Sequence, residues 1–413
     1  MAEPKTDIGG SKHVAVVRGS AWDTTQAAPR VVSVLRELGF KVTVLCWDFT
    51  GQQPAREQAD GLEILRYGRK VPKAGAKFFL SWPLWWRWLR GQFLRHRFDI
   101  VHVMNLDCAI PAVQTRRRAG HKIVYDIRDA WGLCLTGKPF PLPQVFSWLD
   151  RVFSHRVDGL LLSQGMLEFC AAYHGAKAAR TVPVVQVLNV PQEDVGAGGF
   201  RPAGSSAELT LNYSGRISEY RGAYLLPEAV RGTPWRLHVY GKNPNAAVRE
   251  HLAAAPQTTV EGPVPLETSL KYLDQADLVS ILYDPAMKVV FISSANKMFE
   301  AMMLGKPYLC TEGSFPACVA RAFDLGWALP YGDVAALRSF LLDLAAHPEK
   351  LAQAGRNGRA AYEAHFQWDR QKRNLIDLYR YLTGDPEVVP RPRQGWDRFI
   401  GEAYSFPPPA TLS

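Results

Sequence analysis

Short runs of apolar and β-branched residues recur along the chain and are separated by amphipathic stretches. In the first part of the sequence these runs are His13–Val17, Lys41–Trp47, Ile100–Met104, Lys122–Tyr125 and Leu160–Ser163. Apolar runs that alternate with helical patterns are typical of βαβ units, in which helices cover both faces of a parallel sheet. The pattern therefore predicts a doubly wound α/β domain.

The alternation restarts after a polar, glycine-rich interval, Glu193–Glu208, which we interpret as a linker. The next strands are expected at Leu209–Tyr213, Arg236–Tyr240, Leu278–Leu282 and Pro307–Cys310. A last helix is predicted over Trp368–Leu382, and the Gly384-Asp385-Pro386 sequence ends it. The second part of the chain is thus a second α/β domain.

The length of the chain agrees with two domains, because 413 residues exceed the roughly 250–300 at which a single core stops growing. We assign 1–195 to an N-terminal domain, 205–365 to a C-terminal domain, 366–384 to a helix that could cross back to the N-terminal domain, and 385–413 to an irregular tail. Two doubly wound units joined by a linker are expected to face a cleft at the carboxyl ends of their strands.

Composition narrows the class of protein. No stretch of about 18 apolar residues occurs, and the N-terminus lacks the apolar core of a signal peptide, so we expect a protein inside the cell. The six cysteines are scattered without a C-x-x-C pair, which argues against a zinc site and against a disulfide framework. A formal net charge of +10 indicates an anionic partner.

The basic excess is concentrated in the N-terminal half, where Ile64–Phe98 contains no Asp or Glu. Aromatic and basic residues alternate there, among them Trp82, Trp85, Trp86, Arg87 and Arg90. Tryptophan settles at headgroup depth and each basic residue contributes about 1 kcal/mol near anionic lipid, so we predict peripheral contact with an anionic membrane. The alternative is a core helix whose tryptophans pack inward. Nucleic acid would attract the same residue types, but no nucleic-acid-binding module accompanies them, and we expect none as a partner.

An apolar strand runs into a basic, glycine-containing turn at Tyr213–Gly222. Gly215 lets a ligand approach the backbone, and Arg216 and Arg221 flank a short loop ahead of a predicted helix. Two guanidinium groups together with the N–H groups of a helix start suit a diphosphate. The alternative is a pair of solvated arginines in a surface loop.

A second polar cluster opens the helix predicted within Ser293–Pro307. Helical periodicity directs Met298 and Met302 toward the core, whereas Asn296 and Glu300 share another face near the helix start. A carboxylate in that position can accept hydrogen bonds from ribose hydroxyls. These residues are therefore candidates for contacts with a nucleotide.

Four motifs together resemble a known family. The string S-x-N-K-x-F-E-x-M-x-x-G-K-P at 294–307, preceded by G-R-I-S-E-Y-R-G at 215–222, resembles the C-terminal domain of the family-four (group 1) glycosyltransferases of the GT-B fold. The segments Phe98–Asp107 and Lys122–Trp131 are similar to the matching N-terminal strands in the branch that builds bacterial surface polysaccharides. The resemblance covers roughly residues 12–383.

This resemblance implies two Rossmann-like domains facing a cleft, and transfer of a hexose-type sugar from a nucleotide-sugar with retention of configuration. It places Arg216 and Arg221 at the donor diphosphate, with Arg221 where the family usually has lysine, and Glu300 at the nucleotide ribose. The other donor-side positions that it implies are Gly19, Gly215, Ser294, Asn296 and Lys297. In the front-face displacement of this family the leaving phosphate takes the acceptor proton, so no protein nucleophile is required.

Candidate residues on the acceptor side follow or lie in the N-terminal strands. They are His102, Asp126, Arg128 and Asp129. A hydrogen-bonded core histidine is the alternative for His102, and a structural ion pair is the alternative for the other three. No Asp-x-Asp sequence occurs, so we expect a metal-independent reaction without a cofactor, in which arginines neutralise the leaving diphosphate.

Two positions depart from the family pattern. The first of its paired glutamates should fall at position 292, which is Ile292 here, and Met104 replaces a frequent histidine. A catalytically silent nucleotide-sugar-binding or partner subunit therefore remains an alternative. An epimerase on the same fold is a third reading, although the sequence lacks the two glutamates and the histidine-rich cleft expected of it.

The leading hypothesis combines these observations. We expect a sugar transferase that acts on a growing, lipid-linked glycan in polysaccharide or glycolipid synthesis. The basic aromatic segment would place it in the cytoplasm at the inner face of the cell membrane.

Overall fold

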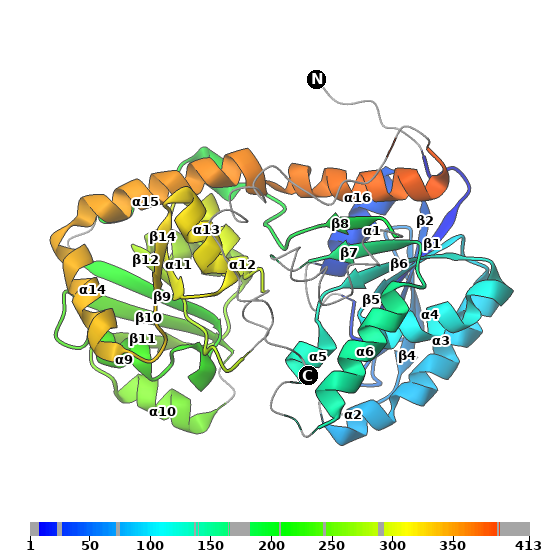
Figure 1. Cartoon of the computed structure of the whole chain (residues 1–413), viewed down its shortest axis with the longest axis horizontal. Helices are drawn as coiled ribbons and strands as arrows, with labels where there is room; N and C mark the ends of the chain where they lie inside the picture. Colours follow the sequence, from blue (N-terminus) through cyan, green and yellow to red (C-terminus); the bar gives the residue numbers. More distant parts are fainter. Residues whose placement is uncertain are drawn as a thin grey trace. The chain divides into compact units, whose positions relative to one another are not determined.

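The computed structural model describes residues 8–22, 27–71, 75–135, 138, 140–163, 165, 182–205, 208–242, 245–287, 293–385 and 388. These residues form two compact α/β units, each built on one sheet (Figure 1). The N-terminal unit contains the described residues up to Leu188 and those from Gln371 onward. The C-terminal unit contains the described residues from Asn189 to Arg370.

The sheet of the N-terminal unit has eight strands in the order β3-β4-β2-β1-β5-β6-β7-β8. All neighbours pair in parallel except β3 and β4, which form an antiparallel edge. The strands are β1 (His13–Arg18), β2 (Lys41–Asp48), β3 (Arg56–Ala59), β4 (Leu62–Gly68), β5 (Ile100–Met104), β6 (Lys122–Ile127), β7 (Gly159–Leu162) and β8 (Val184–Gln186). The chain leaves β1 toward one edge and β5 toward the other, so the switch point, where doubly wound sheets bind ligands, lies between β1 and β5.

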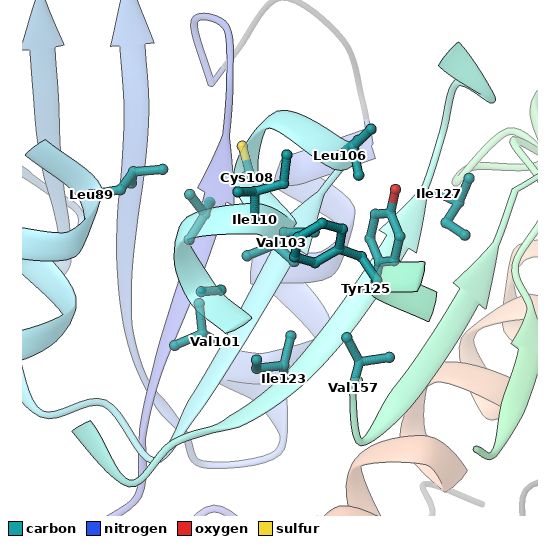
Figure 2. Close-up of a cluster of buried hydrophobic side chains, with 14 of the residues drawn as sticks. Leu89, Val101, Val103, Leu106, Cys108, Ile110, Ile123, Tyr125, Ile127 and Val157 are labelled. Carbon is teal, nitrogen blue, oxygen red and sulfur yellow. The ribbon is translucent and has the colours of Figure 1, made fainter. Parts of the chain in front are cut away.

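Helices cover this sheet because its strands are apolar on both faces. They are α1 (Ala27–Glu37), α2 (Ala76–Leu80), α3 (Trp82–His96), α4 (Leu106–Ala119), α5 (Trp131–Cys134) and α6 (Leu142–Ser154). Figure 2 shows the core next to β5 and β6, where Val101 is paired with Ile123 and Val103 with Tyr125. The Tyr125 hydroxyl donates to Oδ1 of the buried Asp150 at 2.6 Å, so this core includes a hydrogen-bonded polar pair.

Helix α3 is a core helix, and this corrects part of the membrane prediction. Trp82 is 4% exposed and Trp85 is fully buried, with its ring stacked 5.3 Å from that of Trp47. Neither tryptophan is placed to contact a membrane, because the surrounding aromatic rings leave Trp85 without exposed surface and Trp82 with almost none. Trp86 is half-buried and donates to the Asp107 carbonyl, whereas Arg87 is exposed and Arg90 bonds Gln114. No helix among the described residues is long and apolar enough to cross a bilayer.

The sheet of the C-terminal unit is entirely parallel, with six strands in the order β11-β10-β9-β12-β13-β14. The strands are β9 (Leu209–Arg216), β10 (Trp235–Lys242), β11 (Thr258–Glu261), β12 (Leu278–Ile281), β13 (Tyr308–Thr311) and β14 (Gly326–Leu329). The helices are η1 (Val195–Gly198), η2 (Glu219–Arg221), α9 (Leu225–Val230), α10 (Ala246–Ala254), α11 (Leu266–Gln275), α12 (Asn296–Met303), α13 (Phe315–Phe323), α14 (Val334–Ala346), α15 (Pro348–Ala361) and the π-helical η4 (Tyr362–Phe366). The switch point of this sheet lies between β9 and β12.

The last helix, α16 (Trp368–Thr383), begins in the C-terminal unit and continues in the N-terminal one. Its Gln371 side chain accepts a hydrogen bond from the Leu188 N–H at 3.0 Å, and Asn374 donates to the Gln186 carbonyl at 2.8 Å. The Lys122 ammonium donates to the Leu382 carbonyl at 2.6 Å. These contacts make α16 part of the N-terminal unit beyond its first residues.

The fold class predicted from the sequence, two doubly wound α/β units, is confirmed. Every strand predicted from an apolar run is present, with ends that shift by a few residues. The final helix predicted over Trp368–Leu382 is also present as α16.

Candidate functional site

The turn after β9 is shaped by glycines at the carboxyl end of the central strand. Gly215 has a positive φ of 101° and lies opposite Gly241 of β10. A Cβ on Gly241 would lie 2.0 Å from the Gly215 carbonyl oxygen, so the two backbones meet at a distance that only glycine permits. The turn therefore exposes Gly215 and the Arg216 side chain to solvent at the edge of the sheet.

The loop beyond this turn is fixed by tyrosine hydroxyls. The Tyr213 hydroxyl accepts from the Ser218 N–H at 3.1 Å and donates to its carbonyl at 3.2 Å. The Tyr331 hydroxyl donates to the Glu219 carbonyl at 2.8 Å. Since burial raises the pKa of Tyr213 far above its usual value, this hydroxyl keeps its proton and remains a donor. The loop is held by side chains of the core and does not depend on Arg216 or Arg221.

The two arginines of this loop keep their positive charges uncompensated. Within the part of the chain that the structure describes, neither Arg216 nor Arg221 forms an ion pair with a carboxylate. The Arg221 guanidinium lies 4.9 Å from the ring centroid of Tyr283, in the segment that follows β12. The Asp284 N–H donates to the Tyr220 carbonyl at 2.9 Å, so the segments after β9 and β12 are in direct contact. An anion at this switch point would meet two cationic groups that have no carboxylate partner among the described residues.

Helix α12 starts at the same edge of the sheet, because it follows β12. Lys297 lies 2.9 Å from Oε2 of Glu300, donates to the Ser269 hydroxyl at 3.0 Å and lies 5.8 Å from the ring centroid of Tyr240. The Glu300 side chain retains 13% exposure, and Asn296 is exposed at the first position of the helix. The helix is anchored by Met298 and Met302, which are fully buried, as the periodicity predicted. Lys297 thus holds the Glu300 carboxylate in one orientation.

The remaining donor-side candidates are placed as follows. Ser294 is buried just ahead of α12. Position 292, where the sequence has Ile292 instead of the expected glutamate, lies outside the described residues. The structure therefore brings together Gly215, Arg216 and Arg221 in one loop, and Ser294, Asn296, Lys297 and Glu300 at the start of the neighbouring helix.

The N-terminal unit has a polar cluster at its own switch point. Asn105, in the left-handed region with a φ of 66°, follows β5, and its side-chain oxygen accepts from the N–H groups of Arg128 and Asp129 at 2.9 Å each. Its amide donates to the Asp129 carboxylate at 3.0 Å. Asn105 therefore fixes the turn after β6 and leaves Asp129 exposed at the strand ends.

Asp126 and His102 lie deeper in the same region and form a closed network. The Arg128 guanidinium lies 2.7 Å from Oδ2 of the buried Asp126, and the His102 Nε2 lies 3.3 Å from the same oxygen. Burial by itself would raise the pKa of Asp126, but the charge and hydrogen bonds of Arg128 and His102 together outweigh it, and the pKa lies below its usual value. His102 is fully buried, so the acceptor contact considered for it is not possible here and the core alternative describes it. Asp126 and Arg128 form the ion pair that the sequence left as an alternative.

Two residues of this cluster were not singled out from the sequence. Asp107 is almost fully buried at the start of α4, and burial raises the pKa of its carboxyl to about 7. A Cβ on Gly19 would lie 1.8 Å from the Asp107 Oδ2, so the turn after β1 can approach this carboxyl only because residue 19 is glycine. Arg18, at the end of β1, has its pKa lowered by burial and by the nearby positive charge of Arg128. Both residues stand at strand ends next to the switch point, and that position was the signal that could have identified them.

Comparisons with known proteins agree with this architecture. Residues 24–185 match a sequence family described as the glycosyl transferase 4-like domain, in agreement with the resemblance to glycosyltransferases found in the sequence. No curated protein sequence matches the chain.

Solved structures are similar over nearly the whole chain. A sucrose-phosphate synthase from Thermosynechococcus elongatus has a TM-score of 0.71 at 15% identity, covering 90% of this chain and 99% of that one. HepE from Anabaena in complex with UDP and glucose has a TM-score of 0.60 at 11% identity, covering 90% and 100%. WaaG, a glycosyltransferase involved in lipopolysaccharide biosynthesis, has a TM-score of 0.60 at 14% identity, also covering 90% and 100%.

At these identities the likeness establishes the fold, which is the GT-B arrangement of two Rossmann-like domains. Together with the family match, it supports a glycosyltransferase of the GT-B type.

Proposed function

We propose that the protein transfers a hexose-type sugar from a nucleoside diphosphate donor to a glycan acceptor, with retention of configuration. The observation that carries this proposal is the pair of arginines after β9, which have no carboxylate partner among the described residues. Charge developing on the leaving diphosphate is the main electrostatic demand of such a transfer, and fixed cations next to it are the most direct way to stabilise the transition state.

The nucleotide side of the proposal rests on α12. Glu300 lies 2.9 Å from Lys297, and 13% of its side chain is exposed. A carboxylate so oriented can accept hydrogen bonds from both hydroxyls of a ribose. HepE, which shares the fold, was solved in complexes with UDP and with UDP-glucose, so uridine nucleotides are the first donors to test.

The reaction needs no metal or other cofactor in this proposal, because Arg216 and Arg221 supply the positive charge that a cation would provide. In a front-face transfer the leaving phosphate oxygen accepts the proton of the attacking hydroxyl. The protein's part is then to hold the diphosphate, the ribose and the acceptor in one geometry.

The acceptor is proposed to be lipid-linked, as in polysaccharide or glycolipid synthesis. Arg18 and Arg128 bring two guanidinium groups to the strand ends of the N-terminal unit, where burial and then the positive charge of Arg128 lower the pKa of Arg18. A polyprenyl-diphosphate carrier would supply the anionic group that such a site favours. The enzyme would then work in the cytoplasm, peripherally attached to the inner face of the cell membrane.

A ligand panel followed by a transfer assay tests this function. Thermal unfolding is measured with the diphosphates of each nucleoside and with their sugars, because a ligand of the folded state raises its stability by mass action. At least one uridine or other nucleoside diphosphate should raise the unfolding temperature, and the matching sugar donor should be turned over with lipid-linked glycan acceptors. Binding without any transfer would favour the silent-subunit alternative, and altered sugar formed without acceptor would favour an epimerase.

A further inference from the structure

We propose that the face of the N-terminal unit formed by α2, the start of α3 and the segment 140–148 is its membrane-docking surface. This inference rests on the proposed function in one respect, since a lipid-linked acceptor is what gives an enzyme a use for such a surface. The proposed surface does not include Trp82 and Trp85, which are buried, and is formed by a different set of residues. We call the set the docking face: Leu80, Leu84, Phe140, Leu142, Val145 and Trp148.

The first observation is that exposed apolar side chains are concentrated there. Phe140 is 81% exposed, Leu80 76% and Trp148 60%, which are the highest values among the large apolar residues that the structure describes. Helix α6 is the clearest case. Leu142, Val145 and Trp148 follow a three-residue spacing on its solvent side, while Phe146 and Phe153 are buried on the other. A helix that is apolar on its solvent side as well needs a second apolar environment.

The second observation is that these segments adjoin one another. The Phe79 ring, next to Leu80, packs 5.5 Å from the ring of Phe146 on α6. The Trp82 ring lies 5.8 Å from that of Phe146, and Figure 1 shows α2 beside the end of α6. The exposed leucines of α2 and α3 and the exposed residues of α6 therefore belong to one region of the same unit.

The third observation is the charge of this region. Ile64–Phe98 has no acidic residue, and within Trp131–Val157 the only one is Asp150, which is buried against Tyr125. The exposed charges contributed by these stretches include Lys77, Arg87 and Lys138. A face with exposed tryptophan and phenylalanine, to which these two stretches contribute exposed basic side chains and no exposed carboxylate, is complementary to an anionic bilayer surface. A second copy of the same face would bring like charges together, so self-association fits it less well.

Vesicle cosedimentation of the full chain tests this surface directly. Vesicles of phosphatidylcholine with phosphatidylglycerol should bind the protein, and pure phosphatidylcholine should bind it much more weakly. The variant Leu84→Gln/Val145→Gln/Trp148→Gln should lose binding by tenfold or more, while its thermal unfolding and its affinity for the nucleoside diphosphate stay unchanged. Each of Lys77→Gln, Arg87→Gln and Lys138→Gln should weaken binding to the anionic vesicles roughly fivefold.

Matched controls lie in the C-terminal unit. Leu342→Gln removes a leucine of similar exposure, and Arg249→Gln removes an exposed arginine, and neither should change vesicle binding. Trp148→Phe keeps an aromatic ring and should still bind, but it should reduce the quenching of tryptophan fluorescence by brominated lipids.

Three results would overturn the proposal. The first is vesicle binding that the triple variant leaves intact, and the second is brominated-lipid quenching that Trp148→Phe leaves intact. The third is a dimer in analytical ultracentrifugation that the triple variant dissociates while vesicles fail to bind. None of these readouts uses sugar transfer, so failure of the docking face and failure of the proposed function are separate outcomes.

Discussion

The hydroxyl of Tyr379 lies 2.9 Å from Nδ1 of His102, although 277 positions separate the two residues. Their rings are nearly parallel, and the other ring nitrogen of His102 faces Asp126 at 3.3 Å. Both polar atoms of this histidine are therefore engaged inside the N-terminal unit. His102 was considered from the sequence as an acceptor contact, but in the structure it links helix α16 to the sheet.

Tyr379→Phe should destabilise the protein by about 1–3 kcal/mol, because it leaves a buried ring nitrogen of His102 without a partner. The measurement is urea-induced unfolding followed by circular dichroism. Tyr381→Phe, on an exposed tyrosine of the same helix, is the control and should have little effect. Equal stability of the two variants would mean that the buried hydrogen bond contributes nothing.

Asp107→Asn should change how stability depends on pH. The folded carboxyl has a pKa of about 7 because it is buried, against a usual value of 3.8, so the folded state binds a proton that the unfolded state has lost. The contribution of this carboxyl to the free energy of unfolding is complete below the pKa of the unfolded state. It is lost as pH rises from about 4 to about 7, and the total loss is on the order of 4 kcal/mol.

Asparagine resembles the protonated form, so urea midpoints of the variant and of the natural chain should agree near pH 4. At pH 8 the variant should be the more stable of the two. A variant that loses the same stability at both pH values would contradict the raised pKa of Asp107.

Gly241→Ala should weaken binding of the nucleoside diphosphate even though residue 241 need not touch it. The new Cβ would lie 2.0 Å from the Gly215 carbonyl oxygen and would displace the turn that carries Arg216. Gly262→Ala is the matched control, because a Cβ there meets nothing within 4 Å and its backbone is not in the left-handed region. Isothermal titration should show a loss for the first variant only.

Arg216→Ala and Arg221→Ala should each lower the rate of sugar transfer by roughly 10²–10³, as expected when one preorganised donor to a developing charge is removed. Arg221→Lys keeps the charge but loses the planar contact with Tyr283, so its activity should be intermediate. Arg236→Ala removes an exposed arginine that is paired with Glu208 and should leave the rate unchanged. Full activity of both alanine variants at Arg216 and Arg221 would exclude the diphosphate assignment.

Glu300→Ala should reduce affinity for a nucleoside diphosphate by about 1.5–3 kcal/mol, the usual worth of hydrogen bonds to a charged group. The loss should be much smaller for the corresponding 2′,3′-dideoxynucleotide, because the hydroxyls that the carboxylate would bind are then absent. Glu267→Ala, which breaks an exposed pair with Lys271 on α11, serves as the control. An equal loss with both ligands would place Glu300 away from the ribose.

The sequence predicted the central strands of both sheets well and the outermost strands poorly. Val14–Val17 is apolar on both faces, and in Val101–Met104 the only polar residue is His102. Strand β3 reads Arg-Glu-Gln-Ala and β11 reads Thr-Thr-Val-Glu, so neither carries an apolar run. Such strands form because the adjacent strand presents backbone N–H and C=O groups for pairing. The presence of that adjacent strand cannot be read from the sequence of the segment itself.

Candidate site residues could be identified from the sequence where one short segment shows both a suitable side chain and its place after a strand. Arg216 ends β9, Arg221 follows it closely, and Glu300 is on the helix that comes after β12, so their position on the carboxyl side of two paired strands followed from the order of elements. Trp82 and Trp85 show the opposite case, because a basic aromatic helix gives the same pattern whether its tryptophans face lipid or a neighbouring Trp47. Which face of the helix is buried depends on contacts between segments far apart in the sequence, and the composition of the helix does not predict those contacts.

The N-terminal unit is built from two stretches of the chain that are separated by the whole C-terminal unit. A ribosome releases Leu375 and Tyr379, which complete that unit, only after it has synthesised all of the residues from Asn189 to Arg370. The later-made half of the chain can therefore reach its native state first, while the earlier half waits for its last helix. Cutting the chain between the two sheets would consequently leave the first piece without the helix that completes it.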